Sequence, residues 1–322
     1  MTFTPNPHFR PEAVPPPAGP EVQAFHRGLP GYRPTPIRVV DGVRLKDESD
    51  RFGLPAFKIL GASWAVERTL RAHPDTRVLV AASAGNHGRA VARVAAQRGL
   101  GCRIYLPAVT SAARADLIAS EGADVVRVDG DYNAAVALAE RDGAALVADT
   151  ALEPAEGPPE WVIDGYSTLF REIDGPVDVL LVPTGVGSLA AAAVRWAVHE
   201  RPGTAVVAVE PATAACVTAS LVAGRMTAVD TPGTTMAGMD CATPSAVAWP
   251  TLRHGLSGTI TVTDDQAARA MRDLAAAGLT IGECGAATLA AWRADGTPGR
   301  SVLCVATEGA SDPDAYARAL SA

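Results

Sequence analysis

Two lysines are set apart among the basic residues of this 322-residue chain. Of its 28 lysines and arginines, only Lys46 and Lys58 are lysines. Guanidinium stays protonated, whereas a desolvated ammonium can lose its proton and form a Schiff base. Lys58 suits that chemistry better because it lies between Phe57 and Ile59, and an apolar environment is expected to lower its pKa. The alternative is that Lys58 merely begins a helix running towards Arg71.

A polar loop with the sequence Ser83-Ala84-Gly85-Asn86-His87 follows the apolar run 78–81 and precedes a helical pattern. Open α/β sheets bind ligands at the carboxyl ends of their strands, and free N–H groups at a helix start favour anions such as a carboxylate. The side-chain amide of Asn86 can hydrogen-bond a ring hydroxyl or a ketone oxygen. The loop is therefore a candidate substrate site. The alternative is a tight turn with an N-cap and a surface His87.

A second loop, Gly185-Val186-Gly187-Ser188-Leu189, has the same setting between an apolar run and a helical pattern. Glycines let the backbone approach a phosphate closely, and Ser188 can donate its hydroxyl as well as its N–H. The loop lacks the Gly-Lys-Ser/Thr of a Walker P-loop and the third glycine of a dinucleotide fingerprint. A phosphate loop is the favoured interpretation, with a Rossmann oxidoreductase or a purely structural turn as alternatives.

A third polar loop, Thr307-Glu308-Gly309, follows the apolar run 302–306. A hydroxyl or carboxylate at the end of a buried parallel strand can reach a ligand held over the sheet. The alternative is that Thr307 caps the region of the last helix and that Glu308 is solvated.

Short apolar runs alternate with helical patterns along the chain, as is typical of βαβ units and parallel sheets. A first strand is expected to end at 44–46, and further strands are expected at 78–81, 102–106, 125–128, 145–148, 179–182, 205–209, 259–263 and 302–306. The expected helices are 57–72, 86–98, 111–121, 132–141, 165–173, 188–200, 264–277 and one from Pro313. Residues 1–25 are rich in proline, so we expect an extended or partly disordered arm.

Composition narrows the class of protein. A net charge of −7 argues against a nucleic-acid partner. The five cysteines form no C-x-x-C pair, which indicates buried thiols in a reducing cytosol rather than a disulfide framework or a zinc site. No signal peptide or membrane-spanning run is expected, so a cytoplasmic location is predicted. Glu210 could help to bind a cation, but one carboxylate is not a site, and no metal is predicted.

The lysine, the asparagine loop, the glycine loop and the late Thr307, in that order, resemble the fold-type II, or tryptophan-synthase-like, family of pyridoxal-phosphate enzymes. Further segments look like the signature of diaminopropionate ammonia-lyases. These segments are His26 to Pro34, Lys46 to Ser49, Arg51 to Leu54, Ala56 to Lys58, Asp149-Thr150, Trp161, Asp164 to Thr168, Met236 to Gly238, Trp249, Gly282-Glu283 and Gly285-Ala286.

The resemblance implies an α/β protein with two open parallel-sheet domains and pyridoxal 5'-phosphate in the cleft between them. Lys58 would form the Schiff base and move the proton at the substrate Cα, with Phe57 beside it. Asn86 would lie beside the ring hydroxyl, Gly185, Val186, Gly187, Ser188 and Leu189 would hold the phosphate, and Thr307 would face the pyridine nitrogen. Asp149 would be the acid near the leaving group. A homodimer is also implied.

The chain departs from the ammonia-lyases at one position. They have an aspartate before the glycine of the asparagine loop, where this chain has Ala84, and Ser83 to His87 instead look like serine and threonine dehydratases and serine racemases. A hydroxyl such as Thr307 would not keep the ring nitrogen protonated, which favours expulsion of a group from Cβ. The leading hypothesis is α,β-elimination from a small β-substituted amino acid. Racemisation, β-replacement and a non-catalytic binding subunit remain alternatives.

Interruptions in the alternation predict the domain boundaries. The segment 151–160 contains three prolines and a glycine and looks like a crossing between domains. We expect a small substrate-binding domain at 76–160 and a large cofactor-binding domain built from 26–75 and 161–322. The three polar loops would then converge between the two domains.

Overall fold

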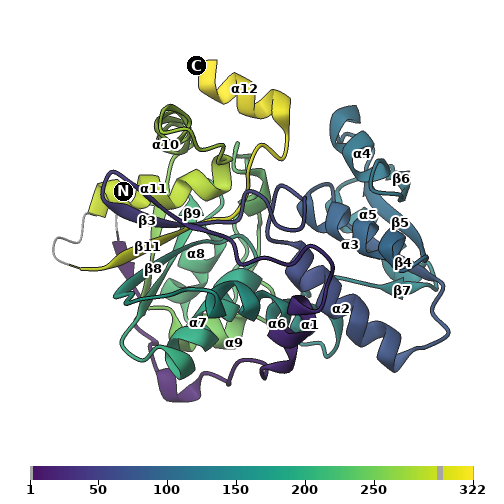
Figure 1. Ribbon diagram of the computed structural model, residues 1–322, viewed down its shortest axis with the longest axis horizontal. Helices are drawn as coiled ribbons and strands as arrows, with labels where there is room; N and C mark the ends of the chain where they lie inside the picture. Colours follow the sequence, from purple (N-terminus) through teal and green to yellow (C-terminus); the bar gives the residue numbers. More distant parts are fainter. Residues whose placement is uncertain (1–2, 296–299, 322) are drawn as a thin grey trace.

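The computed structural model describes residues 3–295 and 300–321. These residues form two β-sheets, the larger at the left of Figure 1 and the smaller at the right, each flanked by helices. Residues 1–2, 296–299 and 322, which belong to the predicted arm and the predicted large domain, lie outside the described residues. None of the described helices is both long enough and apolar enough to cross a membrane.

The larger sheet has seven strands in the order β1-β10-β9-β8-β11-β3-β2. Its inner neighbours are parallel, and the edge strands β1 and β2 are antiparallel to the strands they pair with. The strands are β1 (Phe3–Pro5), β2 (Ile37–Val40), β3 (Val43–Asp47), β8 (Val179–Pro183), β9 (Ala205–Pro211), β10 (Gly258–Val262) and β11 (Val302–Ala306).

Both faces of the larger sheet are buried. In β8, Leu180 and Val182 join one apolar cluster with α6 (Pro158–Arg171) and α7 (Ser188–Glu200), whereas Val179 and Leu181 join a second cluster with α10 (Asp264–Ala276) and α11 (Glu283–Asp295). Successive side chains of a strand point to opposite faces, so a strand covered on both faces is a continuous apolar run. This burial explains why the inner strands could be predicted.

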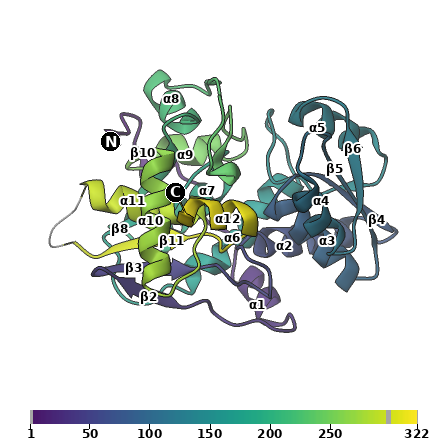
Figure 2. The same ribbon diagram turned by 90° about the horizontal axis from the view of Figure 1, so that it is seen from above.

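The smaller sheet has four parallel strands in the order β6-β5-β4-β7. They are β4 (Val78–Ala82), β5 (Gly101–Pro107), β6 (Asp124–Val128) and β7 (Ala145–Leu146), joined by α3 (Asn86–Gln97), α4 (Ala112–Ala119) and α5 (Tyr132–Arg141). Figure 2 shows this sheet and its helices on one side of α2 (Ile59–Ala72), with the larger sheet on the other.

The proline-rich N-terminal segment, which was expected to be extended or partly disordered, follows a defined path over residues 3–25. β1 pairs with β10, and the short helices η1 (Pro11–Ala13) and α1 (Glu21–Arg27) follow it. The Asn6 side chain donates to two carbonyl groups, those of Arg253 (2.9 Å) and Leu256 (2.7 Å), and Val14 is buried. An edge strand and bends tolerate proline because they need few N–H donors.

Other differences from the expected elements are local. Helix α6 begins at Pro158 rather than near 165, and its two prolines lie in the first turn, where a helix needs no N–H donor. Outside the N-terminal arm, the elements that were not predicted are β2, α8 (Cys216–Ala223), η2 (Ala237–Met239), α9 (Trp249–Gly255) and α11. The remaining expected strands and helices are present, including α12 (Pro313–Ser321), with ends shifted by two residues at most.

Candidate functional site

Lys58 lies at the N-cap of α2, directly after a short connection to the larger sheet. Ala56 forms an antiparallel bridge with Glu308, and the Phe57 N–H donates to the Thr307 carbonyl at 3.3 Å. These backbone contacts hold Lys58 beside the carboxyl end of β11. The predicted Schiff-base lysine and the third polar loop therefore meet here, although they are far apart in the sequence.

Asp149, which follows β7 of the smaller sheet, is the partner of Lys58. The Lys58 Nζ donates to the Asp149 Oδ2 at 2.9 Å, and the two side chains are 24% and 15% exposed. The Nδ1 atom of the buried His87 lies 3.8 Å from the same carboxylate oxygen. The pair brings together the two residues that were predicted to be catalytic.

The electrostatics of this pair correct one prediction. Burial is the largest single influence and lowers the pKa of Lys58, as expected for an apolar wall. The charge of Asp149, the hydrogen bond to it and the nearby Tyr166 and Cys241 together outweigh burial, and the pKa is raised above its ordinary value. Burial likewise raises the pKa of Asp149, but the charges of His87 and Lys58 outweigh it and hold that pKa well below its ordinary value. In this arrangement the two side chains form an ammonium–carboxylate pair.

The end of β11 offers one uncommitted hydroxyl. Thr307 is buried, and its Oγ1 has no hydrogen-bond partner among the described residues. The neighbouring Glu308 is not solvated, because its Oε2 accepts from the Asn86 side chain at 2.9 Å and its Oε1 accepts from the Cys284 N–H at 3.3 Å. Burial raises the pKa of Glu308. The alternative in which Glu308 is a solvated surface residue is therefore wrong.

The asparagine loop joins the smaller sheet to this region. Besides its bond to Glu308, the Asn86 Nδ2 donates to the Ser311 Oγ at 3.1 Å. His87 is buried rather than on the surface, with its Nε2 2.8 Å from the Val147 carbonyl. Ser83 and Ala84 are half-buried, and Gly85, the N-cap of α3, is exposed. These are the predicted substrate-binding residues.

The glycine loop reaches the same site through Asp149, because the Ser188 hydroxyl donates to the Asp149 carbonyl at 2.9 Å. Gly187, the N-cap of α7, has φ +98°, which favours glycine. A Cβ at Gly185 would lie 2.9 Å from both the Cys241 Sγ and the Gly238 carbonyl oxygen. Val186 is half-buried and Leu189 is buried. No side chain caps α7, so its N–H groups remain available to an anion.

Two side chains of the site were not predicted. The ring of the fully buried Tyr166 stacks on Phe57 with their centroids 4.8 Å apart, and the Lys58 Nζ lies 5.9 Å from its centroid. Cys241 packs on Gly185, and burial raises its pKa to about 12. Tyr166 stood within a quoted motif, and a signal that could have identified it is Gly165, which pairs with Gly61 where the two helices cross.

Glu210 lies apart from these groups and has protein donors for both carboxylate oxygens. Its Oε1 accepts from the Val217 N–H, and its Oε2 accepts from the N–H and hydroxyl of Thr218, at 2.6–2.8 Å. Within residues 3–295 and 300–321, no three His, Cys, Asp or Glu side chains are grouped so as to hold a metal ion. The carboxylate serves to begin α8.

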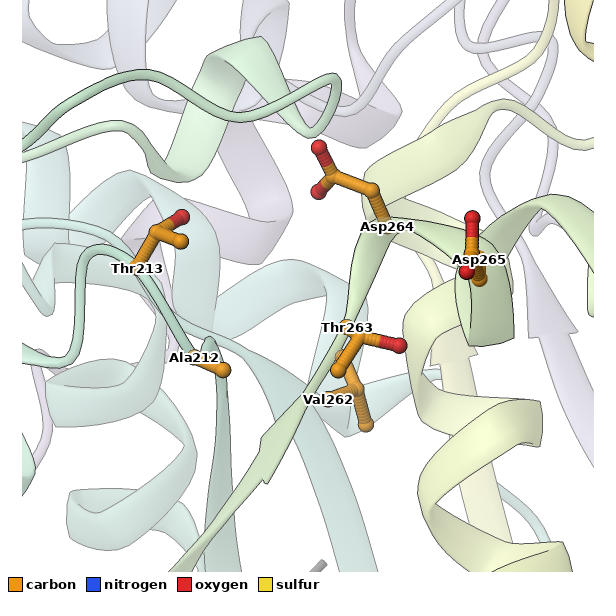
Figure 3. A pocket seen from close by; sticks show the side chains of 6 residues that line it. All are labelled: Ala212, Thr213, Val262, Thr263, Asp264 and Asp265. Carbon is orange, nitrogen blue, oxygen red and sulfur yellow. The ribbon is translucent and has the colours of Figure 1, made fainter.

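A shallow pocket lies elsewhere, at the carboxyl ends of β9 and β10 (Figure 3). It is lined by Ala212, Thr213, Val262, Thr263, Asp264 and Asp265. The Asp264 carboxylate accepts from the Thr235 N–H at 2.9 Å and from the Thr234 hydroxyl, so it anchors the segment before η2 (Ala237–Met239). None of the predicted site residues lines this pocket.

Comparison with protein families gives a match over most of the chain. Residues 29–308 match the model described as "Pyridoxal-phosphate dependent enzyme". The chain is 35% identical to the diaminopropionate ammonia-lyase of Salmonella typhimurium over 80% of this chain and 76% of that protein. It is 30% identical to the biosynthetic L-threonine dehydratase of the same organism over 73% of this chain and 46% of that protein.

A solved structure gives a similar result. The diaminopropionate ammonia-lyase of Escherichia coli, in complex with an aminoacrylate-PLP azomethine reaction intermediate, superposes with a TM-score of 0.90 at 29% identity. The match covers 99% of this chain and 96% of that one, so it includes both sheets.

Proposed function

The chain belongs to the pyridoxal-phosphate-dependent enzyme family, and from that premise we propose that it is an ammonia-lyase acting on diaminopropionate. The predicted fold-type II architecture and the predicted pyridoxal phosphate cofactor are confirmed. The main support for diaminopropionate as substrate is the hydrogen bond of 2.9 Å between the Lys58 ammonium and the Asp149 carboxylate, because it shows that Asp149 can bind an ammonium.

The residues present fit the cofactor. The buried hydroxyl of Thr307 has no hydrogen-bond partner among the described residues, so it is free to bond a pyridine nitrogen. Gly185 leaves no room for a Cβ, and the uncapped start of α7 offers N–H groups to a phosphate. We propose that Lys58 holds the aldehyde end, Asn86 the ring hydroxyl, Thr307 the ring nitrogen, and Gly185 to Leu189 the phosphate. When bound, the cofactor supplies an electron sink for the charge left on Cα.

Lys58 is the proposed base. An amine in this position removes the Cα proton when it is neutral, provided that it is held in line with the Cα–H bond. The backbone contacts of Phe57 and Ala56 with β11 supply that orientation.

Asp149 has a role that depends on its charge. A carboxylate with a strongly lowered pKa is a poor proton donor near neutral pH, so the role of acid near the leaving group needs revision. It is well suited to bind an ammonium, since it binds that of Lys58. The β-ammonium of diaminopropionate already carries the proton that its departure as ammonia requires, whereas the hydroxyl of serine would need an acid. Asp149 therefore favours an amine as leaving group.

A second candidate is a serine or threonine dehydratase. The half-buried Ala84 favours it, because no carboxylate lies at that position. The similarity to a threonine dehydratase, which spans 73% of this chain, also favours it. The two candidates differ in the leaving group, an amine or a hydroxyl.

A substrate panel separates them. L- and D-diaminopropionate, serine, threonine and cysteine should be compared by the rate of 2-oxo acid formation. We expect L-diaminopropionate to have the highest kcat/KM, and Asp149→Asn to lower that value by roughly 10²-fold while affecting serine less. A higher kcat/KM for serine or threonine in the unmodified protein would instead favour the dehydratase.

The organisation of the molecule also remains a proposal. We propose that 76–160 moves as a small domain against 26–75 and 161–322. Contacts between the two parts include the Asn86–Ser311 hydrogen bond and the ion pair between the Arg114 Nε and the Asp312 Oδ2 at 3.3 Å. A homodimer and a cytoplasmic location are proposed on the family resemblance and the composition, and sedimentation would test the former.

A further inference from the structure

Helices α2 and α6 cross at two glycines close to Lys58. A Cβ at Gly165 would lie 2.5 Å from the Leu60 carbonyl oxygen and 2.7 Å from the Gly61 Cα. A Cβ at Gly61 would lie 2.6 Å from the Cε1 atom of Tyr166. Such distances are shorter than real Cβ contacts, so glycine at both positions lets the two backbones approach. The approach brings the Tyr166 ring against the first turn of α2, directly after Lys58.

The phenol of Tyr166 is buried beside Lys58 without a hydrogen-bond partner. The residue is 0% exposed, and its OH has no partner among the described residues. Buried tyrosine hydroxyls usually find a partner, because an unpaired buried polar group is costly. The Lys58 Nζ lies 5.9 Å from the ring centroid. The hydroxyl is therefore available to the one amine that the proposed mechanism has to move.

We propose that Tyr166 is a positioning residue that accepts a hydrogen bond from the Lys58 ammonium when that ammonium leaves Asp149. The inference rests on the proposed role of Lys58. If Asp149 binds the β-ammonium of the substrate, the Lys58 ammonium that forms on removal of the Cα proton loses its carboxylate partner. The phenol oxygen then holds the Nζ atom, and so stabilises the ammonium that Lys58 becomes on taking the Cα proton.

A purely structural role for the ring predicts something different. The stacking on Phe57 and the tight crossing at Gly61 need the ring but not its oxygen. Replacing Tyr166 with Phe removes only the oxygen, so it separates the two roles. Tyr105→Phe is the matched control, because its hydroxyl donates to Asp142 within the smaller sheet and it touches none of the proposed catalytic residues.

The scarcity of lysine makes a direct measurement practical. Protein labelled with ¹⁵N-lysine has only two lysine side chains, Lys46 and Lys58. In protein freed of cofactor and carrying Asp149→Asn, which removes the carboxylate partner of Lys58, adding Tyr166→Phe should shift the Nζ signal of Lys58 and leave that of Lys46 in place. Tyr105→Phe should shift neither. In the cofactor-loaded enzyme, Tyr166→Phe should lower kcat roughly 10- to 100-fold with little change in KM, the range expected for one hydrogen bond to a charged group.

Two results overturn the inference. A Lys58 signal that does not shift when Tyr166→Phe is added to Asp149→Asn shows that the phenol does not contact the amine, whatever happens to kcat. A kcat within about twofold of the unmodified enzyme shows that the contact does not assist removal of the Cα proton. The Nζ signals need neither cofactor nor substrate, so failure of the proposed ammonia-lyase activity in the substrate panel would be recognised separately.

Discussion

The chain has two lysines, and their surroundings differ in one respect. The Lys46 Nζ donates to the Thr35 carbonyl and to the Glu172 Oε2, both at 2.8 Å, and its side chain is 0% exposed. Arg51 donates to both Glu48 and Glu172 in the same cluster. Two cations face two carboxylates, and each charge is paired. This lysine cluster, Lys46, Glu48, Arg51 and Glu172, has no group left over for a ligand.

The surroundings of Lys58 are incomplete by comparison. Its side chain is 24% exposed, and three buried polar atoms around it have no partner among the described residues: the Thr307 Oγ1, the Tyr166 OH and the His87 Nδ1. Buried polar groups are normally paired, so unpaired ones in a group indicate a site that a ligand completes. A lysine whose neighbours all have hydrogen-bond partners is thus structural, as at Lys46. A lysine with unpaired polar neighbours is suited to bind a ligand, as at Lys58.

The largest expected effect follows from removing Lys58. Lys58→Ala should abolish the cofactor absorbance that borohydride bleaches, and should lower kcat/KM by roughly 10⁴-fold or more, because the same amine binds the cofactor and moves the proton. Lys58→Arg should not restore either property, since guanidinium does not lose its proton. Peptide mapping after borohydride reduction checks the assignment. A label on Lys46 would contradict the comparison of the two lysines.

Removing Lys46 should affect stability instead. Lys46→Met leaves the buried cluster with an excess of negative charge, and breaking a buried pair typically costs about 3–5 kcal/mol of unfolding free energy. We expect urea unfolding to show this loss while the cofactor absorbance is retained. Arg33→Met is the control, because its pair with Asp50 is more than half exposed and should contribute only about 0–1 kcal/mol. Equal losses in the two variants would refute the contrast.

Position 84 tests whether the face of the cofactor opposite Lys58 lacks a general base. The D-enantiomer presents its Cα proton to the face opposite Lys58, and Ala84 has no titratable group. A positioned base contributes about 10²–10⁴-fold, so D-diaminopropionate should react at least about 10²-fold more slowly than the L-enantiomer. Ala84→Asp should raise the D-activity selectively. Comparable kcat/KM values for the enantiomers in the unmodified enzyme would mean that Ser83, Asp149 or water supplies the base.

The fold could be predicted from the sequence because the local apolar patterns match the segments that are buried. The strands of both sheets are apolar runs with glycine-rich joins, and the polar loops follow strand ends, where parallel topology gathers them. β2 and α11 were missed because a short edge strand and a helix apolar on most sides lack a clear period.

What the sequence could not supply was the pairing of distant side chains. The pKa of Lys58 was predicted from its neighbours in sequence, yet Asp149, which follows the other sheet, decides its direction. Tyr166 comes close only because Gly61 and Gly165 let two helices approach. The order in the N-terminal arm likewise depends on carbonyl groups near residue 255. Each is a contact between elements that no local pattern encodes.

The smallest expected effect is on the pH dependence of stability, and it comes from Glu210, a buried carboxylic acid with no basic side chain among its hydrogen-bond donors. Glu172 faces Arg51 and Lys46, and although burial raises its pKa, their bonds and charges lower it overall. Glu210 has only N–H and hydroxyl donors, and burial raises its pKa to about 7 from an ordinary 4.5. The folded state thus retains the Glu210 proton more firmly than the unfolded state. Its contribution to stability is fully present below pH 4.5 and is lost as the pH rises through 7.

Glu210→Gln should remove this pH dependence. Between pH 4 and pH 8, the unfolding free energy of the unmodified protein should fall relative to that of Glu210→Gln. The fall should be at most roughly 3 kcal/mol, at 1.36 kcal/mol for each unit of pKa. Urea unfolding across that range measures it, with Glu140→Gln on the exposed face of α5 as control. A difference that stays constant with pH would mean that the donors of Val217 and Thr218 stabilise the carboxylate as well as two cations stabilise Glu172.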